Sequence, residues 1–167
     1  MVTVKKATQN DFEKLLPLLF ELDSRKQTQD EWQSLFRAHW DGHKNYFGYV
    51  MYDGENAVGF LGLLFSQRIL NDSLIKFCNI TSWVVKKKYR RQSLHLLFPV
   101  LELDNHTITA LTCNAGTHFI TKKLGFVDLE VGRRIILPLP IPLNLKPSTK
   151  IIFNPSEIKE KLKGETL

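Results

Sequence analysis

The stretch "VVKKKYRRQSLHLL", residues 84–97, joins an apolar segment to the start of a predicted helix and carries five cations in the six positions 86–91. The segment before it, 74–85, has the apolar, β-branched character of a long strand. Backbone N–H groups at the start of a helix are unpaired, and the helix dipole adds about half a positive charge there. A strand that leads into such a turn is a candidate phosphate-binding site.

The charge of the chain points to the same place. The net charge is +6, from 23 basic and 17 acidic residues, and removing the five cations would leave about +1. The basic excess is therefore local and predicts a local anionic partner. A solvated cationic loop is the alternative interpretation. A nucleic-acid surface is disfavoured, because the sequence shows no recognition-helix or RNP-like motif and no aromatic row beside the cluster.

Toward the N-terminus, the sequence predicts a strand at 2–5 and two capped helices. Asn10 with Glu13, and Thr28 with Glu31, have the spacing of capping boxes. We expect Pro17 to kink the first helix. From residue 46 the period changes to that of strands, and a β-hairpin is predicted from 46–52 and 57–67, followed by a turn at 71–72.

Toward the C-terminus, helices and strands alternate. The predicted elements are a helix at 92–103 distorted by Pro99, a buried strand at 107–113, a helix at 116–124, strands near 126–131, 134–139 and 150–153, and a helix from about Ser156. Together these elements predict a single α/β domain over residues 1–167 with a mixed sheet.

Two motifs carry a resemblance to a known family. Residues 85–95, "VKKKYRRQSLH", resemble the "V-x-P-x-Y-R-G-x-G-I-G" turn of the GNAT family of N-acetyltransferases, with Arg90 at its Q/R position. Residues 114–126, "NAGTHFITKKLGF", resemble the family's "N-x-x-A-x-x-x-Y-x-K-x-G-F". A predicted strand separates the two motifs, as in the family, and the resemblance covers about residues 2–140.

The resemblance implies a fold, a cosubstrate and a site. The fold would be a mixed, mostly antiparallel sheet flanked by helices and splayed between its fourth and fifth strands, with 141–167 adding a strand and a helix. The cosubstrate would be acetyl-CoA or another acyl-CoA, and backbone N–H groups near Val85 would polarise its thioester carbonyl. The implied cofactor-binding residues are Val85, Arg90, Arg91, Gln92, Ser93, Leu94, His95 and Asn114.

The sequence departs from the family at its functional positions. Ser93 and His95 replace the glycines that permit close approach of the backbone to pyrophosphate. Thr121 replaces the tyrosine that protonates the departing thiolate in many members, and Asn79 replaces a glutamate that serves some members as general base. These two are the family-equivalent catalytic positions. His118, one helical turn from Thr121, is a further catalytic candidate, with a packing role as the alternative.

The acceptor is expected to be a small molecule with an amine or hydroxyl, held between the two N-terminal helices and the C-terminal strands. That region is aromatic, with core packing as the alternative explanation: Trp32, Phe36, His39, Trp40 and Tyr46. Cys113 is a second packing-or-catalysis candidate. A zinc site at His39 and His43, with Asp41 nearby, is disfavoured because Gly42 is expected to end the helix between them and no third ligand is evident, so no metal is predicted.

Two function hypotheses follow. The first is an acyltransferase that works by direct transfer, and the alternative is a weak or inactive GNAT-like module that binds CoA or a protein partner. No secretory signal or membrane span is recognisable, so we expect a cytoplasmic protein, monomeric or homodimeric, with no membrane and no specific nucleic-acid partner.

Overall fold

The computed structural model describes residues 1–22, 27–37, 44–129 and 154–162. The chain divides into two units, Met1–Phe126 and Val127–Leu167. The first unit holds the sheet and nearly all helices, and the second holds α5 (Pro155–Leu162), which confirms the predicted C-terminal helix. That residues 1–167 form one domain stays a prediction.

The first unit is built on a five-stranded sheet with the strand order β1-β2-β3-β4-β5. The strands are β1 (Val2–Ala7), β2 (Gly48–Asp53), β3 (Asn56–Leu70), β4 (Ser73–Val85) and β5 (His106–Thr109). Neighbouring strands are antiparallel except β4 and β5, which are parallel. The expected mixed, mostly antiparallel sheet is confirmed. Asn71 and Asp72, with φ of 49° and 58°, form the predicted turn between β3 and β4.

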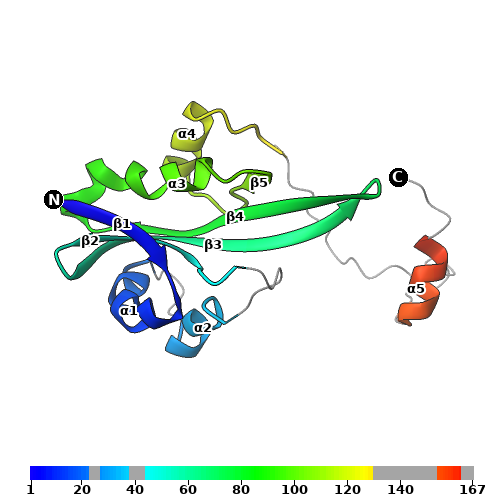
Figure 1. The fold of residues 1–167 in the computed structure, drawn as a ribbon, viewed down its shortest axis with the longest axis horizontal. Coiled ribbons are helices and arrows are strands. Elements are labelled where there is room, and N and C mark those ends of the chain that lie inside the picture. The colour runs from blue at the N-terminus through cyan, green and yellow to red at the C-terminus, as the bar shows by residue number, and fades with distance from the viewer. Residues whose placement is uncertain (23–26, 38–43, 130–153, 163–167) are drawn as a thin grey trace, which may run out of the picture. The chain divides into compact units, whose positions relative to one another are not determined.

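Helices cover both faces of the sheet (Figure 1). The 3-10 helix η1 (Gln9–Asp11), α1 (Phe12–Glu21) and α2 (Gln29–Ser34) lie on one face, and the 3-10 helix η2 (Lys87–Leu96), α3 (Phe98–Leu101) and α4 (Ala115–Lys123) lie on the other. Each face has its own hydrophobic core. On the α1 side the core includes Phe12, Leu15, Leu19, Phe36 and Phe60, and on the η2 side Met51, Leu61, Phe65, Cys78, Leu96 and Leu97.

The predicted N-terminal caps are half right. The Thr28–Glu31 capping box is present at the start of α2, where the Thr28 N–H donates to Glu31 Oε2 at 2.7 Å. The Asn10–Glu13 box is wrong, because the pair that forms is Thr8 with Asp11, at the start of η1. The same spacing of an oxygen-bearing residue and an acid three positions later occurs in both registers, and the chain uses the earlier one.

The predicted helix at 92–103 is also wrong in its form. The chain makes the 3-10 helix η2 and then a new short helix, α3, in whose first turn Pro99 lies. Proline lacks an N–H and clashes with the preceding turn inside a helix, but its missing donor costs nothing at a helix start. The motif expected from the sequence to bind phosphate therefore lies on a 3-10 helix and not at the N-terminus of an α-helix.

The strands predicted after η2 are shorter or not observed. β5 ends at Thr109, four residues before the predicted end at Cys113. α4 begins one residue earlier than predicted, with Asn114 as its N-cap. Residues 126–129 form no strand, and the strands predicted at 134–139 and 150–153 lie outside the described residues.

Candidate functional site

The strands β4 and β5 separate in the middle of the sheet. Their pairing runs from Lys76 with His106 to Asn79 with Thr109 and then stops, although β4 continues to Val85. Just beyond Asn79, the pairing of β4 with β3 shifts, so that Thr81 and Ser82 lie opposite the single residue Gly62. Such a bulge bends the strand and increases its twist. β4 thus turns away from β5, and the expected splay is present.

Asn79 holds the two strands together at the point of separation. Its side-chain Oδ1 accepts a hydrogen bond from the Thr109 hydroxyl at 3.1 Å and one from the Leu111 N–H at 3.4 Å. The amide thus takes over from the backbone ladder where the ladder ends. This bridging contact favours a structural role for Asn79, whose amide cannot accept a proton as the family's glutamate does.

A pocket of about 230 Å³ lies at this separation. β4 lines one wall, and the segment from the end of β5 to the first turn of α4 lines the other, while Leu22 reaches it from the end of α1. The lining residues are Leu22, Ile80, Thr81, Ser82, Trp83, Ala110, Thr112, Cys113, Asn114 and Thr117. The lining thus combines hydroxyl and amide groups with apolar side chains.

Gly62 makes the bulge possible. A Cβ atom on Gly62 would lie 2.9 Å from Thr81 Cγ2 and 3.4 Å from the Ser82 nitrogen. Two residues of β4 are crowded against one of β3 here, so a side chain at position 62 would require Thr81 to shift.

Val85 ends β4, two residues beyond Trp83, the last residue of β4 that lines the pocket. The next residue, Lys86, donates its N–H to the Val58 carbonyl on β3 at 2.9 Å. Because successive N–H groups of a strand point to opposite sides, the Val85 N–H points to the side of β4 that β5 has left. A backbone donor there can polarise a carbonyl group held between the strands.

The residues predicted to bind phosphates lie together on η2, but they do not all face solvent. Arg90, Arg91 and His95 are exposed. Leu94 packs against the core on the η2 side. The Gln92 Oε1 atom is buried without a hydrogen-bond partner among the described residues. The two arginines are thus the cofactor-binding candidates of η2 that carry charge to the surface.

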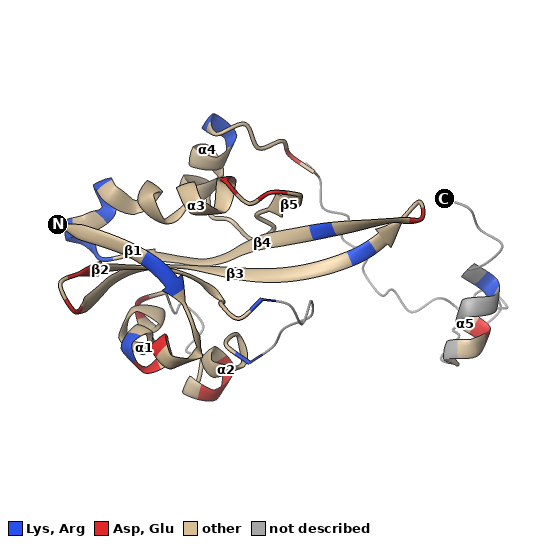
Figure 2. Ribbon diagram, in the orientation of Figure 1, with Lys and Arg blue, Asp and Glu red and all other residues tan. Residues whose placement is uncertain are grey.

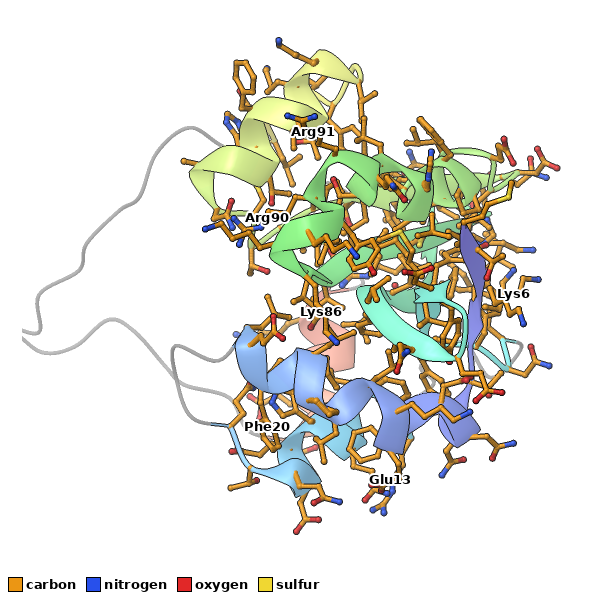
Figure 3. The ribbon with its side chains drawn as sticks, turned by 90° about the vertical axis from the view of Figure 1, so that its left-hand side faces the viewer. Lys6, Glu13, Phe20, Lys86, Arg90 and Arg91 are labelled. Carbon is orange, nitrogen blue, oxygen red and sulfur yellow. The ribbon has the colours of Figure 1, made fainter. Side chains whose placement is uncertain are left out.

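In Figure 2, blue segments mark Lys and Arg on α4, α1 carries both blue and red, and α2 carries red. Figure 3 shows Lys86 between η2 and α1, and Arg90 and Arg91 on the side of η2 next to α4. None of the residues 86–97, all of which the structure describes, has a positive φ. The backbone therefore forms no glycine-type cradle here, and long cationic side chains remain to bind an anion.

A hydrogen bond from η2 to the rest of the sheet fixes the cationic segment. The Tyr89 hydroxyl donates to Asp53 Oδ2, at the end of β2, at 2.6 Å. This bond lowers the pKa of Asp53 from its ordinary value, and the charges of the N-terminal amino group and Lys88 add to the effect. The same contact raises the pKa of Tyr89. Asp53 is therefore a carboxylate at neutral pH, and Tyr89 keeps its proton.

Thr121, which stands where many members of the family have a proton-donating tyrosine, makes a structural hydrogen bond. Thr121 on α4 is 3% exposed, and its hydroxyl donates to the His118 carbonyl at 3.0 Å. Neither Thr121 nor His118 lines the pocket, whereas Cys113 and Asn114 do. The Asn114 Oδ1 caps α4 by accepting the Thr117 N–H at 2.9 Å. These contacts favour structural roles for Thr121 and Asn114.

The contact of Thr121 leads to a stability prediction. Thr121→Val removes the hydroxyl and keeps the shape, so we expect a loss of about 1 kcal/mol in the free energy of unfolding, the net value of one hydrogen bond. Urea denaturation measures it. Turnover, once assayed, should be unchanged. A stable variant without turnover would show instead that Thr121 takes part in the chemistry.

Other sequence-based expectations resolve as follows. Trp32, Phe36 and Tyr46 are buried in the cores, which favours the packing explanation for them, while His39, Asp41, His43 and Trp40 lie outside the described residues. Both cysteines are free, and burial raises the pKa of the Cys78 thiol to about 12. Within the described ranges, no helix has the length and apolar character of a membrane span.

The pocket itself was largely missed by sequence reasoning. Of the residues that line it, sequence reasoning named Cys113 and Asn114, but not the bulge residues Thr81 and Ser82. A glycine at position 62, inside a predicted strand, was the available signal, because glycine in a strand often marks a bulge.

Comparison with solved structures shows which proteins have a fold similar to that of this chain. An acetyltransferase of Trypanosoma brucei matches 82% of this chain over 100% of its own, at 18% identity and a TM-score of 0.59. Glucosamine-6-phosphate N-acetyltransferase of Arabidopsis thaliana matches 81% over 98%, at 14% identity and a TM-score of 0.62. A transcriptional regulator of Bacillus halodurans matches 82% over 100%, at 18% identity and a TM-score of 0.62.

No protein-family model matches the chain, and no curated protein matches it in sequence. The overall fold is nevertheless similar to that of solved acetyltransferases over about four fifths of the chain. The chain therefore has the fold of the GNAT acetyltransferases.

Proposed function

We propose that this protein is an acyl-CoA-dependent acyltransferase that moves an acyl group, with acetyl the expected one, directly to an amine or hydroxyl of a small-molecule acceptor. The observation that carries the proposal is the pocket between β4 and β5. Residues 80–83 of β4 line it, and β4 continues from there to Val85 and leads directly into the cationic η2. The neighbours of known activity that share the fold are acetyltransferases.

An acyl-CoA has three parts that suit this arrangement. Its pantetheine arm, an extended chain with two amides, suits the pocket lined by Thr81, Ser82 and Asn114. Its phosphates suit the exposed Arg90 and Arg91, because charge-assisted contacts to phosphate are the strong ones. Its thioester supplies the activated acyl group, and the Val85 N–H is the donor placed to polarise the thioester carbonyl.

Proton transfer is the weak point of the site. The Thr121 hydroxyl is bonded to a backbone carbonyl and the Asn79 amide cannot accept a proton. Direct transfer would then depend on holding the acceptor against the thioester, since proximity alone can lower a barrier by about 7–11 kcal/mol. A thiolate also leaves without a strong acid, because ordinary thiols have a pKa of about 8.5.

The same contacts support the alternative of a CoA-binding module without turnover. Two measurements separate the functions. CoA should raise the melting temperature, because a ligand at 100 times its dissociation constant adds about 2.7 kcal/mol. Thiol release from acetyl-CoA should then rise above background with at least one member of a panel of amines and hydroxyl compounds.

The outcomes are distinct. Binding with turnover supports the acyltransferase, and binding without turnover across the panel supports the module. No shift of the melting temperature at millimolar CoA would overturn both.

A further inference from the structure

Tyr89 and Asp53 link the cationic segment to a distant part of the chain. Tyr89 is on η2, between Lys88 and Arg90, and Asp53 is the last residue of β2, at its turn into β3. Their 2.6 Å hydrogen bond spans 36 positions of sequence. The Tyr89 ring also packs against the core on the η2 side, so both ends of the side chain are held.

η2 needs an anchor of this kind. Runs of 3-10 helix longer than three or four residues are uncommon, because their hydrogen bonds have poorer geometry, and η2 has 10 residues. The C-terminal end of η2 is held by the buried Leu96. Lys86, the residue before the N-terminal end of η2, is held by the hydrogen bond from its N–H to β3. The exposed run between those points includes the two arginines. Tyr89 is the residue of this run whose side chain reaches β2.

We propose that the Tyr89–Asp53 hydrogen bond is a positioning contact that holds the cations of η2 where they receive the phosphates of acyl-CoA. The proposal rests on the proposed function. In the family's turn, glycines let the backbone itself wrap the phosphates, whereas here Ser93 and His95 stand at those positions and no residue of 86–97 has a positive φ. The cationic side chains of η2 then bind the phosphates in place of a backbone cradle, and Tyr89 fixes their position.

Charge gives the proposal an unusual test. Asp53 is an anion beside Lys88 of η2 and 3.7 Å from the N-terminal amino group. If only charge mattered, Asp53→Asn would strengthen CoA binding, because it removes a competing negative charge. If Asp53 acts by holding Tyr89, the same substitution weakens binding. Tyr89→Phe changes no charge at neutral pH and should weaken binding equally.

The chain offers a matched control on the opposite face of the sheet. The Tyr52 hydroxyl donates to Asp11 Oδ1 at 3.0 Å and ties β2 to η1. Tyr52→Phe therefore also removes a hydrogen bond from a tyrosine hydroxyl to an aspartate. Tyr52 is next to Asp53 on β2, and its side chain points to the opposite face of the sheet. It reports the effect of lost stability without a change at η2.

The experiment measures dissociation constants for CoA and for pantetheine, which has no phosphate, with the parent protein, the three single variants and Tyr89→Phe combined with Asp53→Asn. We expect each of Tyr89→Phe and Asp53→Asn to weaken CoA binding about fivefold, the factor for one net hydrogen bond. The combination should be no weaker than either single change. Pantetheine affinity should be unchanged, and Tyr52→Phe should leave both affinities unchanged.

Amide hydrogen exchange of residues 87–96 in the ligand-free protein supplies an independent readout. Faster exchange in Tyr89→Phe and Asp53→Asn, and not in Tyr52→Phe, is the expected result. Unchanged exchange in Tyr89→Phe, or CoA binding by Asp53→Asn as tight as that of the parent, overturns the positioning role. A parent protein that does not bind CoA overturns the proposed function instead, so the two failures are distinguishable.

Discussion

Thr117→Phe should abolish CoA binding by filling the pocket between β4 and β5. Thr117 lies in the first turn of α4 and lines the pocket, which has a volume of only about 230 Å³. An aromatic ring at this position occupies the space that the pantetheine arm needs. We expect the dissociation constant for CoA to rise by at least about 100-fold, equivalent to about 2.7 kcal/mol, as measured by calorimetric titration.

The fold should survive this change. Thr117 contributes a backbone N–H to the Asn114 cap, and that bond does not depend on its side chain. Threonine and phenylalanine have similar helix propensities. The matched control is Thr107→Phe on the exposed side of β5, outside the pocket, which should bind CoA as the parent does. If Thr117→Phe binds CoA with parental affinity, the ligand does not enter between β4 and β5.

Much of the architecture could be predicted from the sequence. The β3–β4 hairpin follows from long apolar runs around Asn71-Asp72, two residues that tolerate the positive φ of a tight turn. Thr28 with Glu31 fixes the start of α2. These elements were predictable because their determinants are local: the residues that form the turn or the cap are neighbours in the chain.

The errors arise where two local rules compete or where a distant contact decides. Pro99 was expected to distort one helix, yet the chain restarts a helix so that the proline lies in its first turn. β5 was expected to continue to Cys113, but its pairing partner β4 turns away at a bulge. The length of an edge strand depends on its neighbour, which its own sequence does not encode.

For the candidate site, too, local features could be predicted from the sequence and features that depend on distant contacts could not. Positions on single motifs, such as Arg90 and Asn114, were predictable from the sequence. Their roles were not, because a role depends on partners far along the chain. Asn79 bonds to Thr109 and Leu111, 30 and 32 positions away, and Tyr89 bonds to Asp53, 36 positions away. No pattern of residue spacing in the sequence predicts these hydrogen-bonded pairs.

The second large effect is expected from the charges of η2. Arg90→Glu combined with Arg91→Glu replaces two exposed cations, on the side of η2 next to α4, with anions. A hydrogen bond to a charged group contributes about 1.5–3 kcal/mol, and each substitution adds repulsion to that loss. We expect CoA affinity to fall by at least about 100-fold. The control, Arg68→Glu with Lys76→Glu on the far part of the β3–β4 hairpin, makes the same change in net charge and should alter CoA affinity little.

Pantetheine separates the charge effect from the pocket effect. Because pantetheine carries no phosphate, its affinity should be unchanged in the Arg90, Arg91 variant and lost in Thr117→Phe. The salt dependence must agree, since a few phosphates of one nucleotide release few counterions, while a duplex contacted at many phosphates loses affinity steeply as salt rises. The contrary result would be that the double charge reversal leaves CoA affinity intact but removes tight, steeply salt-dependent binding to duplex DNA. The five cations of residues 86–91 would then bind a nucleic acid, and the pocket would bind its ligand without them.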